Sequence, residues 1–204
     1  MAIAAMYERP FSEYAERNGA AILEVLRVEF KACTSVLEIG SGTGQHAALF
    51  ANELSHLSWQ TSDLDENHPG IRAWVDDSGC PRLLSPLSLN VLTATLPAAS
   101  FDAVFSANTA HIMGMDAVQK MFELVGNVLS DGGVFCLYGP FREGGLFNAP
   151  SNAEFHKSLR SRDSVMGIRN IESLDDLGNR HRLARIKLYA MPANNHIAVW
   201  QKRV

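Results

Sequence analysis

The chain has 204 residues, of which 47% are hydrophobic and 20% charged, and its formal net charge at pH 7 is −4. That length predicts one globular domain, and the composition excludes a disordered or fibrous chain. No apolar run approaches the ~18 residues of a membrane-spanning helix, and the first residues lack the basic segment of a secretory signal. We therefore expect a cytoplasmic protein with no membrane partner.

The predicted elements alternate between helix and strand along most of the chain. In chain order they are a helix at 12–30, a strand at 34–40, a helix at 45–54, a strand at 56–63, a helix that begins near Asn67 and Pro69, a strand at 81–91 interrupted by Pro86, a strand at 101–108, a helix at 115–129, a strand at 134–139, helices at 151–163 and about 172–179, and strands at 182–191 and 196–202. Residues 130–133 end the helix before the fifth strand.

The two consecutive strands at 182–191 and 196–202 predict a hairpin that places the last strand antiparallel in the sheet. Together with the alternating pattern, this predicts a Rossmann-like α/β fold. We expect a seven-stranded, mainly parallel sheet with an antiparallel last strand and helices on both faces. We expect a single domain over 1–204, in which 1–33 form a helical lid or cap.

Charge and cysteine content narrow the possible partners. Residues 1–150 carry 8 basic and 17 acidic side chains, whereas residues 151–204 carry 10 and 5. An acidic body makes nucleic acid an unlikely partner, and the basic last quarter either meets an acidic partner or is a solvated surface. The three cysteines form no CxxC pair and no cluster with histidine, so we expect reduced thiols and no metal site. The oligomeric state stays open.

The sharpest local feature is the glycine-rich loop after the first strand, Glu38-Ile-Gly40-Ser41-Gly42-Thr-Gly44. Glycines let the backbone approach a ligand closely, and the following helix presents free N–H groups to it. A dinucleotide-binding loop has its third glycine five residues after the first, whereas here the distance is four. That spacing fits the loop that wraps the amino-acid end of S-adenosylmethionine (SAM).

Two further strand ends supply candidate contacts to such a ligand. Asp63 ends the second strand, where a carboxylate can accept hydrogen bonds from both ribose hydroxyls, and Leu64 follows it. Asp65 is the competing acidic residue. Asn90 and Val91 end the third strand, where an amide oxygen and backbone N–H groups can meet the adenine. Alternatively, Asp63 caps a turn and Asn90 only forms one.

These residues resemble the first two motifs of the class I SAM-dependent methyltransferases. The segments RPFSEYAERN (9–18), NTAHI (108–112), LYGPF (137–141), SNAEFHKSLRSRD (151–163), GIR (167–169) and MPANN (191–195) are similar to one family, the methyltransferase-like 26 group. Asn90, His156 and Asn170 stand where that family's pattern has aspartate. The resemblance covers about residues 8–203 and implies a SAM-binding fold and a methyltransferase, with S-adenosylhomocysteine (SAH) as product and no established substrate.

The implied cofactor site combines the loop with neighbouring segments. Its residues are Glu38, Gly40, Ser41, Gly42, Gly44, Asp63, Leu64, Asn90, Val91 and Asn108, with Arg17 and Asn18 of a first helix that folds over SAM. Methyl transfer needs an aligned nucleophile and often a base. His111 is the candidate base, because its intrinsic pKa is near neutral. Tyr138 and Asn108 are the candidates to orient substrate or the methionine end of SAM. Alternatively, all three have structural roles.

The distinctive segments after the later strands are predicted to meet at the carboxyl edge of the sheet and to bind the substrate. The candidate substrate-binding residues are Tyr138, Pro140, Phe141, Asn152, Asn194 and Asn195. Four arginines (Arg142, Arg160, Arg162 and Arg169) either anchor an acidic substrate group or are solvated or salt-bridged. The lead hypothesis is a methyltransferase acting on a small molecule.

Three other functions stay open at this point. One is a SAM-binding sensor, or a partner of another subunit, without methyl transfer. Another is a methyltransferase acting on protein or RNA, although no NPPY-type tetrapeptide follows the fourth strand, where Ser106-Ala-Asn-Thr109 stands instead. The last is a nicotinamide oxidoreductase, which the glycine spacing opposes.

Overall fold

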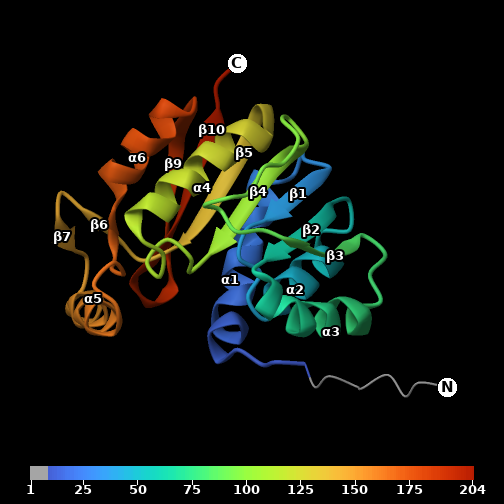
Figure 1. Ribbon diagram of the computed structural model, residues 1–204, viewed down its shortest axis with the longest axis horizontal. Coiled ribbons are helices and arrows are strands. Elements are labelled where there is room, and N and C mark those ends of the chain that lie inside the picture. Colours follow the sequence, from blue (N-terminus) through green and yellow to red (C-terminus); the bar gives the residue numbers. More distant parts are fainter. Residues whose placement is uncertain (1–8) are drawn as a thin grey trace.

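The computed structural model describes residues 9–204, so the first eight residues of the predicted cap lie outside it. It contains a twisted seven-stranded sheet with helices on both faces (Figure 1). In spatial order its strands are β3 (Leu83–Ser88), β2 (Ser58–Asp63), β1 (Ser35–Glu38), β4 (Phe101–Ala107), β5 (Leu129–Gly139), β10 (Asn195–Lys202) and β9 (Leu183–Met191). Six are parallel, and β10 runs antiparallel between β5 and β9. The predicted Rossmann-like fold is therefore confirmed.

The helices cover the two faces of the sheet in separate groups. One face carries α1 (Glu13–Glu29), α2 (Gln45–Glu53) and α3 (His68–Ser78), which follows the short helix η1 (Asp65–Asn67); the other carries α4 (Met115–Val128) and α6 (Ile171–Arg180). Helix α5 (Pro150–Arg162) stands beside the sheet with the small strands β6 (Phe141–Glu143) and β7 (Leu146–Phe147) (Figure 1). None of these helices has the length and apolarity to cross a bilayer.

Each face of the central strands is buried in its own core, as expected for a parallel sheet covered on both sides. Phe105 in β4 packs with Phe50 and Trp59 on the α1–α2 face, at ring-centroid distances of 5.5 and 6.0 Å. Val104, the preceding residue, belongs to the core on the α4–α6 face. Side chains that alternate along β4 therefore pack against both helix layers. This strand precedes the predicted catalytic segment that begins at Asn108.

A second, three-stranded sheet was not predicted from the sequence. It consists of β7 (Leu146–Phe147), β6 (Phe141–Glu143) and β8 (Arg169–Asn170), in that order. A two-residue turn, Gly144-Gly145, joins β6 to β7, and its φ angles of +57° and +79° suit a tight hairpin. Strands of two or three residues are too short to leave a periodic signal in the sequence.

The interruption expected at Pro86 is a local irregularity and not a break: β3 continues to Ser88 at the sheet edge, where a missing N–H is tolerated, but its pairing with β2 shifts register between Leu84 and Leu87. Two other local expectations were wrong. Strand β5 begins at Leu129, directly after α4, because Leu129 already pairs with Phe101. Asn67 stands at the N-cap of α3 but does not cap it; its carboxamide donates to Asp63 instead.

Candidate active site

The loop from β1 to α2 places three glycines in the left-handed region, where other residues are strained. Gly40, Gly42 and Gly44 have φ angles of +74°, +59° and +90°. A Cβ on Gly40 would lie 2.6 Å from Thr109 Cγ2, and one on Gly44 would lie 2.9 Å from the Ile71 Cα, whereas one on Gly42 would meet nothing within 4 Å. Two of the glycines therefore permit close packing, and Gly42 faces open space that a ligand can occupy.

The Glu38 carboxyl group is buried beneath this loop and is 2% exposed. Its Oε2 accepts hydrogen bonds from Ser41 Oγ at 2.8 Å and from Trp59 Nε1 at 3.2 Å. Burial raises the pKa of Glu38 to about 7, although both hydrogen bonds favour the charged form. A ligand ammonium group near the loop would favour the ionised carboxylate, so Glu38 is suited to face a cation.

The Asp63 carboxylate connects the end of β2 to the glycine loop. Its Oδ2 accepts the Gly42 N–H at 2.7 Å, and its Oδ1 accepts the Leu64 N–H at 2.7 Å and Asn67 Nδ2 at 2.8 Å. A carboxylate oxygen has two lone pairs, so Oδ2 can also accept a ligand hydroxyl. Asp65, the competing residue, is solvent-exposed and 3.8 Å from His68 Nε2. Of the two aspartates, Asp63 is the one bonded to the loop.

The segment after β3 forms a turn. Asn90 is exposed, and its Oδ1 accepts the Leu92 N–H at 3.0 Å. One lone pair of this oxygen is thus used in the turn, and the other can accept from a ligand. Val91 packs partly against the core on the α4–α6 face, and Leu64, after β2, exposes 42% of its surface.

Helix α1 presents its two predicted ligand residues to different surroundings. Arg17 is exposed, 3.7 Å from Glu13, and its guanidinium lies over the Tyr14 ring. Asn18 is half-buried, and its Oδ1 lies 2.7 Å from His46 Nε2 in α2. Asn18 therefore faces the body of the protein, while Arg17 faces solvent.

The start of α1 is tied to the helix that follows the glycine loop. The Ser12 N–H donates to Gln45 Oε1 at 2.9 Å, and Gln45 Nε2 donates to Glu16 Oε2 at 3.1 Å. Gln45 is the first residue of α2, directly after Gly44. These bonds hold α1 next to the candidate cofactor loop.

The residues after β4 take an unusual backbone course. Asn108 has a φ of +61°, which is uncommon outside glycine, and its N–H donates to the Tyr138 carbonyl at 2.9 Å. Thr109 is buried, and its Oγ1 lies 2.7 Å from Ser106 Oγ. Because Thr109 also packs against Gly40, this segment is fixed to the glycine loop, and strain of this kind is typical of functional sites.

His111 is buried at 7% exposure, with its ring 5.3 Å from the Phe155 ring. A Cβ on Gly139 would lie 3.7 Å from His111 Nδ1, so the imidazole borders the end of β5. Burial, and then the charge of Arg169, lower the pKa of His111 to about 4. The imidazole is therefore neutral at pH 7 and able to accept a proton, but it binds that proton more weakly than the sequence led us to expect.

Tyr138, at the end of β5, brings three elements together. The side chains of Asn18 in α1 and Asn195 in β10 lie near its phenol, where their amides favour the ionised form. Burial raises the pKa of the Tyr138 phenol, and the two amides only partly offset this effect. Tyr138 therefore stays protonated at neutral pH and acts as a hydrogen-bonding group rather than as a base.

The other predicted substrate residues differ in how they are placed. Pro140 and Phe141 are buried, and Phe141 belongs to the core on the α4–α6 face. Asn152 is buried too, and its Nδ2 donates to the carbonyl of Asn194 at 3.0 Å, which ties α5 to the turn before β10. Asn194 is exposed with a φ of +59°. This group forms a structural frame around Tyr138 and Asn195.

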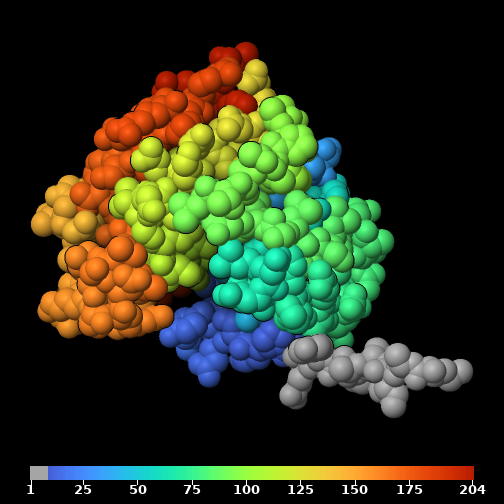
Figure 2. Space-filling model, in the orientation of Figure 1, coloured from blue at the N-terminus to red at the C-terminus, as the bar shows by residue number. Residues whose placement is uncertain are grey.

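The space-filling view shows a hollow where α1, the segment after β2, the segment after β4 and α5 approach one another (Figure 2). The strands of the parallel sheet end on this side, where open α/β sheets bind ligands. The predicted residues that lie at these strand ends include Gly42, Asp63, Asn108 and Tyr138. This convergence supports the position inferred from the sequence.

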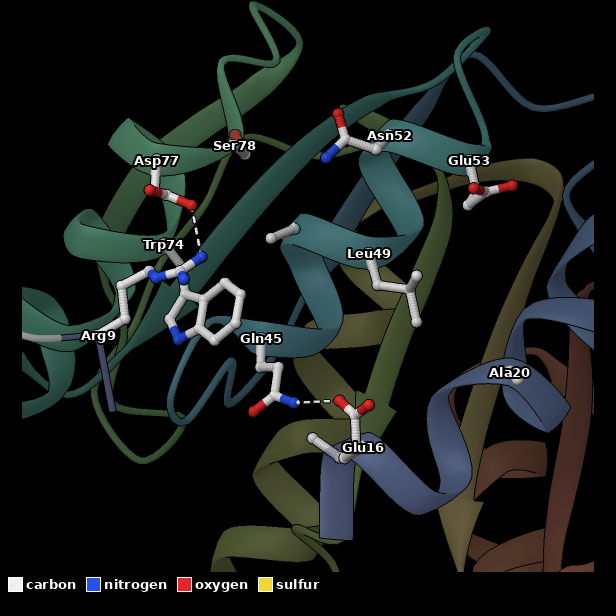
Figure 3. Close-up of a pocket in the computed structure, with 12 residues that line it drawn as sticks. Arg9, Glu16, Ala20, Gln45, Leu49, Asn52, Glu53, Trp74, Asp77 and Ser78 are labelled. Carbon is white, nitrogen blue, oxygen red and sulfur yellow. Dashed lines mark hydrogen bonds and ion pairs between the residues drawn. The ribbon is translucent and has the colours of Figure 1, made fainter. Parts of the chain in front are cut away.

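Another cavity lies elsewhere, on the outer face of α2 between α1 and α3 (Figure 3). Its volume is about 580 Å³, and it is crossed by contacts between Arg9 and Asp77 and between Gln45 and Glu16. Helix surfaces line it and no strand end of residues 9–204 does; Gln45 and Trp74 border the glycine loop at Gly44. We therefore place the candidate site at the sheet edge and not in this groove.

Sequence reasoning missed several residues around the site. His46 lies beside Asn18, and burial lowers its pKa to about 4. No pattern in the sequence signals this contact, because it joins two helices 28 positions apart. Thr109 was also missed as the residue that packs against Gly40. Within residues 9–204, no three histidine, cysteine or acidic residues are grouped to hold a metal ion.

Comparison with a family model gives a match over residues 9–202, to a family described as "Protein of unknown function (DUF938)". The match covers nearly the whole chain. Its description names no activity.

Comparison with solved structures gives class I methyltransferases. An O-methyltransferase family 2 protein from Planctomyces limnophilus, in complex with apigenin, has a TM-score of 0.81 at 14% identity, over 93% of this chain and 58% of that one. An O-methyltransferase family protein from Burkholderia thailandensis has a TM-score of 0.79 at 13% identity, over 91% of this chain and 56% of that one. Human N-acetylserotonin methyltransferase, in complex with SAM, has a TM-score of 0.77 at 12% identity, over 94% of this chain and 53% of that one. The chain thus has the SAM-dependent methyltransferase fold but spans little more than half of each of these proteins.

Proposed function

The chain belongs to the DUF938 family of proteins of unknown function, and we propose that it is a SAM-dependent methyltransferase that acts on a small molecule. The observation that carries this proposal is the joint geometry of Gly42 and Asp63. A glycine facing open space is bonded through its N–H to a carboxylate at the end of the next strand. We further propose that it is related to the methyltransferase-like 26 group, on the motifs at 137–141, 151–163 and 191–195.

In this proposal the glycine loop and the two strand ends beside it each face one part of the cofactor. Asp63 accepts from the ribose hydroxyls, Glu38 faces the amino-acid end, and Leu64 and Asn90 lie toward the adenine. The buried carboxyl of Glu38 and the unfilled space at Gly42 fit a ligand that carries an ammonium group. When bound, SAM supplies an electrophilic methyl group on a sulfonium.

The chain's own residues would position the acceptor and manage its proton. His111 is neutral at pH 7 and can take a proton from an O–H or N–H nucleophile. Tyr138, with the amides of Asn18 and Asn195 near its phenol, orients the acceptor or the amino-acid end of the cofactor. The segment from Arg9 through α1 serves as a cap within a single domain, because Ser12 and Gln45 hold it at the loop.

The test is calorimetric titration of the full chain with SAM and with SAH. Wild-type protein should bind both. Asp63→Asn should lose about 10- to 100-fold in affinity, since a charge-assisted hydrogen bond is worth ~1.5–3 kcal/mol. Asp65→Asn is the matched control, because it makes the same change at an exposed position two residues away, and it should bind like wild type.

If the isolated chain binds neither SAM nor SAH, it is not a methyltransferase on its own. If it binds NADH instead of SAM and SAH, it would be an oxidoreductase. A protein that binds SAM but transfers no methyl group to small molecules, protein or RNA would instead be a SAM sensor. Radiolabelled methyl transfer to a small-molecule extract supports the proposal, and loss of that transfer in Asp63→Asn assigns it to this site.

A further inference from the structure

A second cavity, of about 240 Å³, lies between α5 and the small three-stranded sheet. Three arginines and one histidine line it. They are Arg142 from β6, His156 and Arg160 from α5, and Arg169 from β8. Four basic side chains from three elements thus converge on one small space.

No carboxylate lines this cavity, and none in residues 9–204 lies within 4.0 Å of the three arginines. Arg185, from the same basic quarter of the sequence, is by contrast paired with Asp175 at 2.9 Å. The unpaired charges act on one another. Burial, and then Arg160 and Arg142, lower the pKa of Arg169, and the same charges reinforce the effect of burial on His156. The cavity is therefore positive and uncompensated.

Specific contacts hold these like charges together. The Arg169 side chain donates from Nε to the Ala110 carbonyl at 2.9 Å and from Nη2 to the Val165 carbonyl at 2.8 Å. In the small sheet, Arg142 stands opposite Phe147 in β7 and Asn170 in β8. These contacts position the arginines before any ligand is present.

The Phe147 ring supports two of the basic groups at once. It lies 5.5 Å from the Arg142 guanidinium and 5.2 Å from the His156 ring. The Ile168 N–H donates to His156 Nδ1 at 3.0 Å, so the neutral imidazole carries its proton on Nε2 and is a donor there. Two lining residues have a buried polar atom without a hydrogen-bond partner in residues 9–204, the donor Arg142 Nε and the acceptor Asn170 Oδ1. The cavity thus offers in Arg142 Nε a donor that the protein itself does not satisfy.

We propose that this cavity binds the carboxylate or phosphate group of a small acidic molecule. Guanidinium groups match the geometry of such oxyanions and bind them through paired N–H donors. An oxyanion would supply the missing charge and an acceptor for Arg142 Nε. A volume of about 240 Å³ accommodates one anionic group and not an extended polymer backbone.

The position of the cavity assigns this acidic molecule as the methyl acceptor, a step that rests on the function proposed above. The Gly167 N–H donates to the His111 carbonyl at 2.9 Å, and Gly167 lines the cavity. Arg169 lines it too and is bonded to Ala110, the neighbour of His111. Phe155, one residue before His156, packs on the His111 ring. An anion held here therefore lies against the segment that carries the candidate base.

The first test measures anion binding alone. Inorganic phosphate and succinate are titrated into the full chain at constant ionic strength, with sodium chloride as the non-specific reference, and binding is followed by NMR and thermal shift. At least one should bind saturably, and Arg160→Gln and Arg142→Gln should each weaken it 10-fold or more. Arg162→Gln is the matched control, on the same helix but outside the cavity; it should bind like wild type.

The variants are also titrated with SAM, so that the two proposals can fail separately. Unchanged SAM affinity with lost phosphate or succinate affinity is the expected result. The anion site would be overturned if neither anion saturates the wild-type protein, or if Arg160→Gln and Arg162→Gln lose the same anion affinity. Either outcome holds regardless of the SAM affinity that is measured. Anion binding without SAM binding keeps the site but overturns its role in methyl transfer.

The second test concerns the acceptor. Labelled methyl transfer is measured into the acidic and neutral fractions of a small-molecule extract. Transfer into the acidic fraction that falls at least 10-fold in Arg160→Gln but not in Arg162→Gln supports the assignment. Transfer confined to the neutral fraction, or a short single-stranded RNA that displaces phosphate and itself becomes methylated, would overturn it.

Discussion

Gly42 and Gly79 form a matched pair that tests whether a ligand approaches the glycine loop. Their φ angles are +59° and +60°, and a Cβ at either position would meet no heavy atom within 4 Å. Gly79 is the residue that ends α3 and is no part of the loop. Substitution by alanine therefore imposes the same backbone strain at both positions and no collision within the protein itself.

The cost to folding should be equal. An alanine in the left-handed region is destabilised by about 1–2 kcal/mol. For a domain of this size, each kcal/mol lowers Tm by roughly 2–4 °C, so Gly42→Ala and Gly79→Ala should both melt about 2–8 °C below wild type.

The cost to binding should differ. If SAM lies over Gly42, the new methyl group overpacks the complex by about 1–3 kcal/mol, which weakens binding roughly 5- to 150-fold. Gly79→Ala should bind SAM as tightly as wild type. The assay is calorimetry at a temperature well below both melting transitions. Equal SAM affinity in the two variants would refute the reasoning, because the open space at Gly42 would then have no ligand in it.

Three further predictions follow from the buried polar groups of the site. Because the pKa of Glu38 is raised in the folded protein, ionising this carboxyl group opposes folding. The stability that Glu38 contributes is therefore complete below pH 4.5 and is lost as the pH rises to about 7. Urea unfolding curves of Glu38→Gln should lack this pH dependence, which amounts to up to about 3 kcal/mol. Because the pKa of His111 is lowered in the folded protein, the stability that this residue contributes is complete above pH 6.5 and is lost as the pH falls toward 4. The ¹³C resonance of its ring should titrate with a midpoint near pH 4. A midpoint near 6.5 would contradict the burial of the ring. Tyr138→Phe should cost about 0.5–1.5 kcal/mol, because it removes the phenol oxygen that lies near the amides of Asn18 and Asn195; a loss below about 0.5 kcal/mol in urea would argue against an interaction between them.

The sequence predicted the main sheet because its central strands, such as β4 and β10, contain buried apolar runs bounded by turn residues, although the edge strands β3 and β9 are largely exposed. The hairpin around residues 192–195 was recognisable from the turn residues between its two strands, and it revealed the antiparallel strand. The glycine loop and Asp63 were also predictable, since both are local signals at the end of a strand.

The second sheet and the basic cavity were not predictable in the same way. Arg142, His156 and Arg169 are spread over 28 positions of sequence, and only the strands β6 and β8, of three and two residues, bring the two arginines together. The sequence marked Arg142 and Arg169 either as anchors for an acidic group or as solvated charges, and it could not decide between the two because the cavity forms only in the fold. The lowered pKa of His111 was missed for a related reason, because it depends on burial and on Arg169, which lies 58 positions away along the chain.

The order of the strands has a consequence for how the chain is made. Strand β10 follows β9 in synthesis, yet it lies between β5 and β9 and pairs with both. Until it emerges from the ribosome, β5 has an unpaired edge whose side chains from Val134 to Tyr138 are apolar and buried in the finished protein. The nascent domain is therefore most prone to aggregation just before its last strand arrives, and a chaperone that shields this edge would have its greatest effect then.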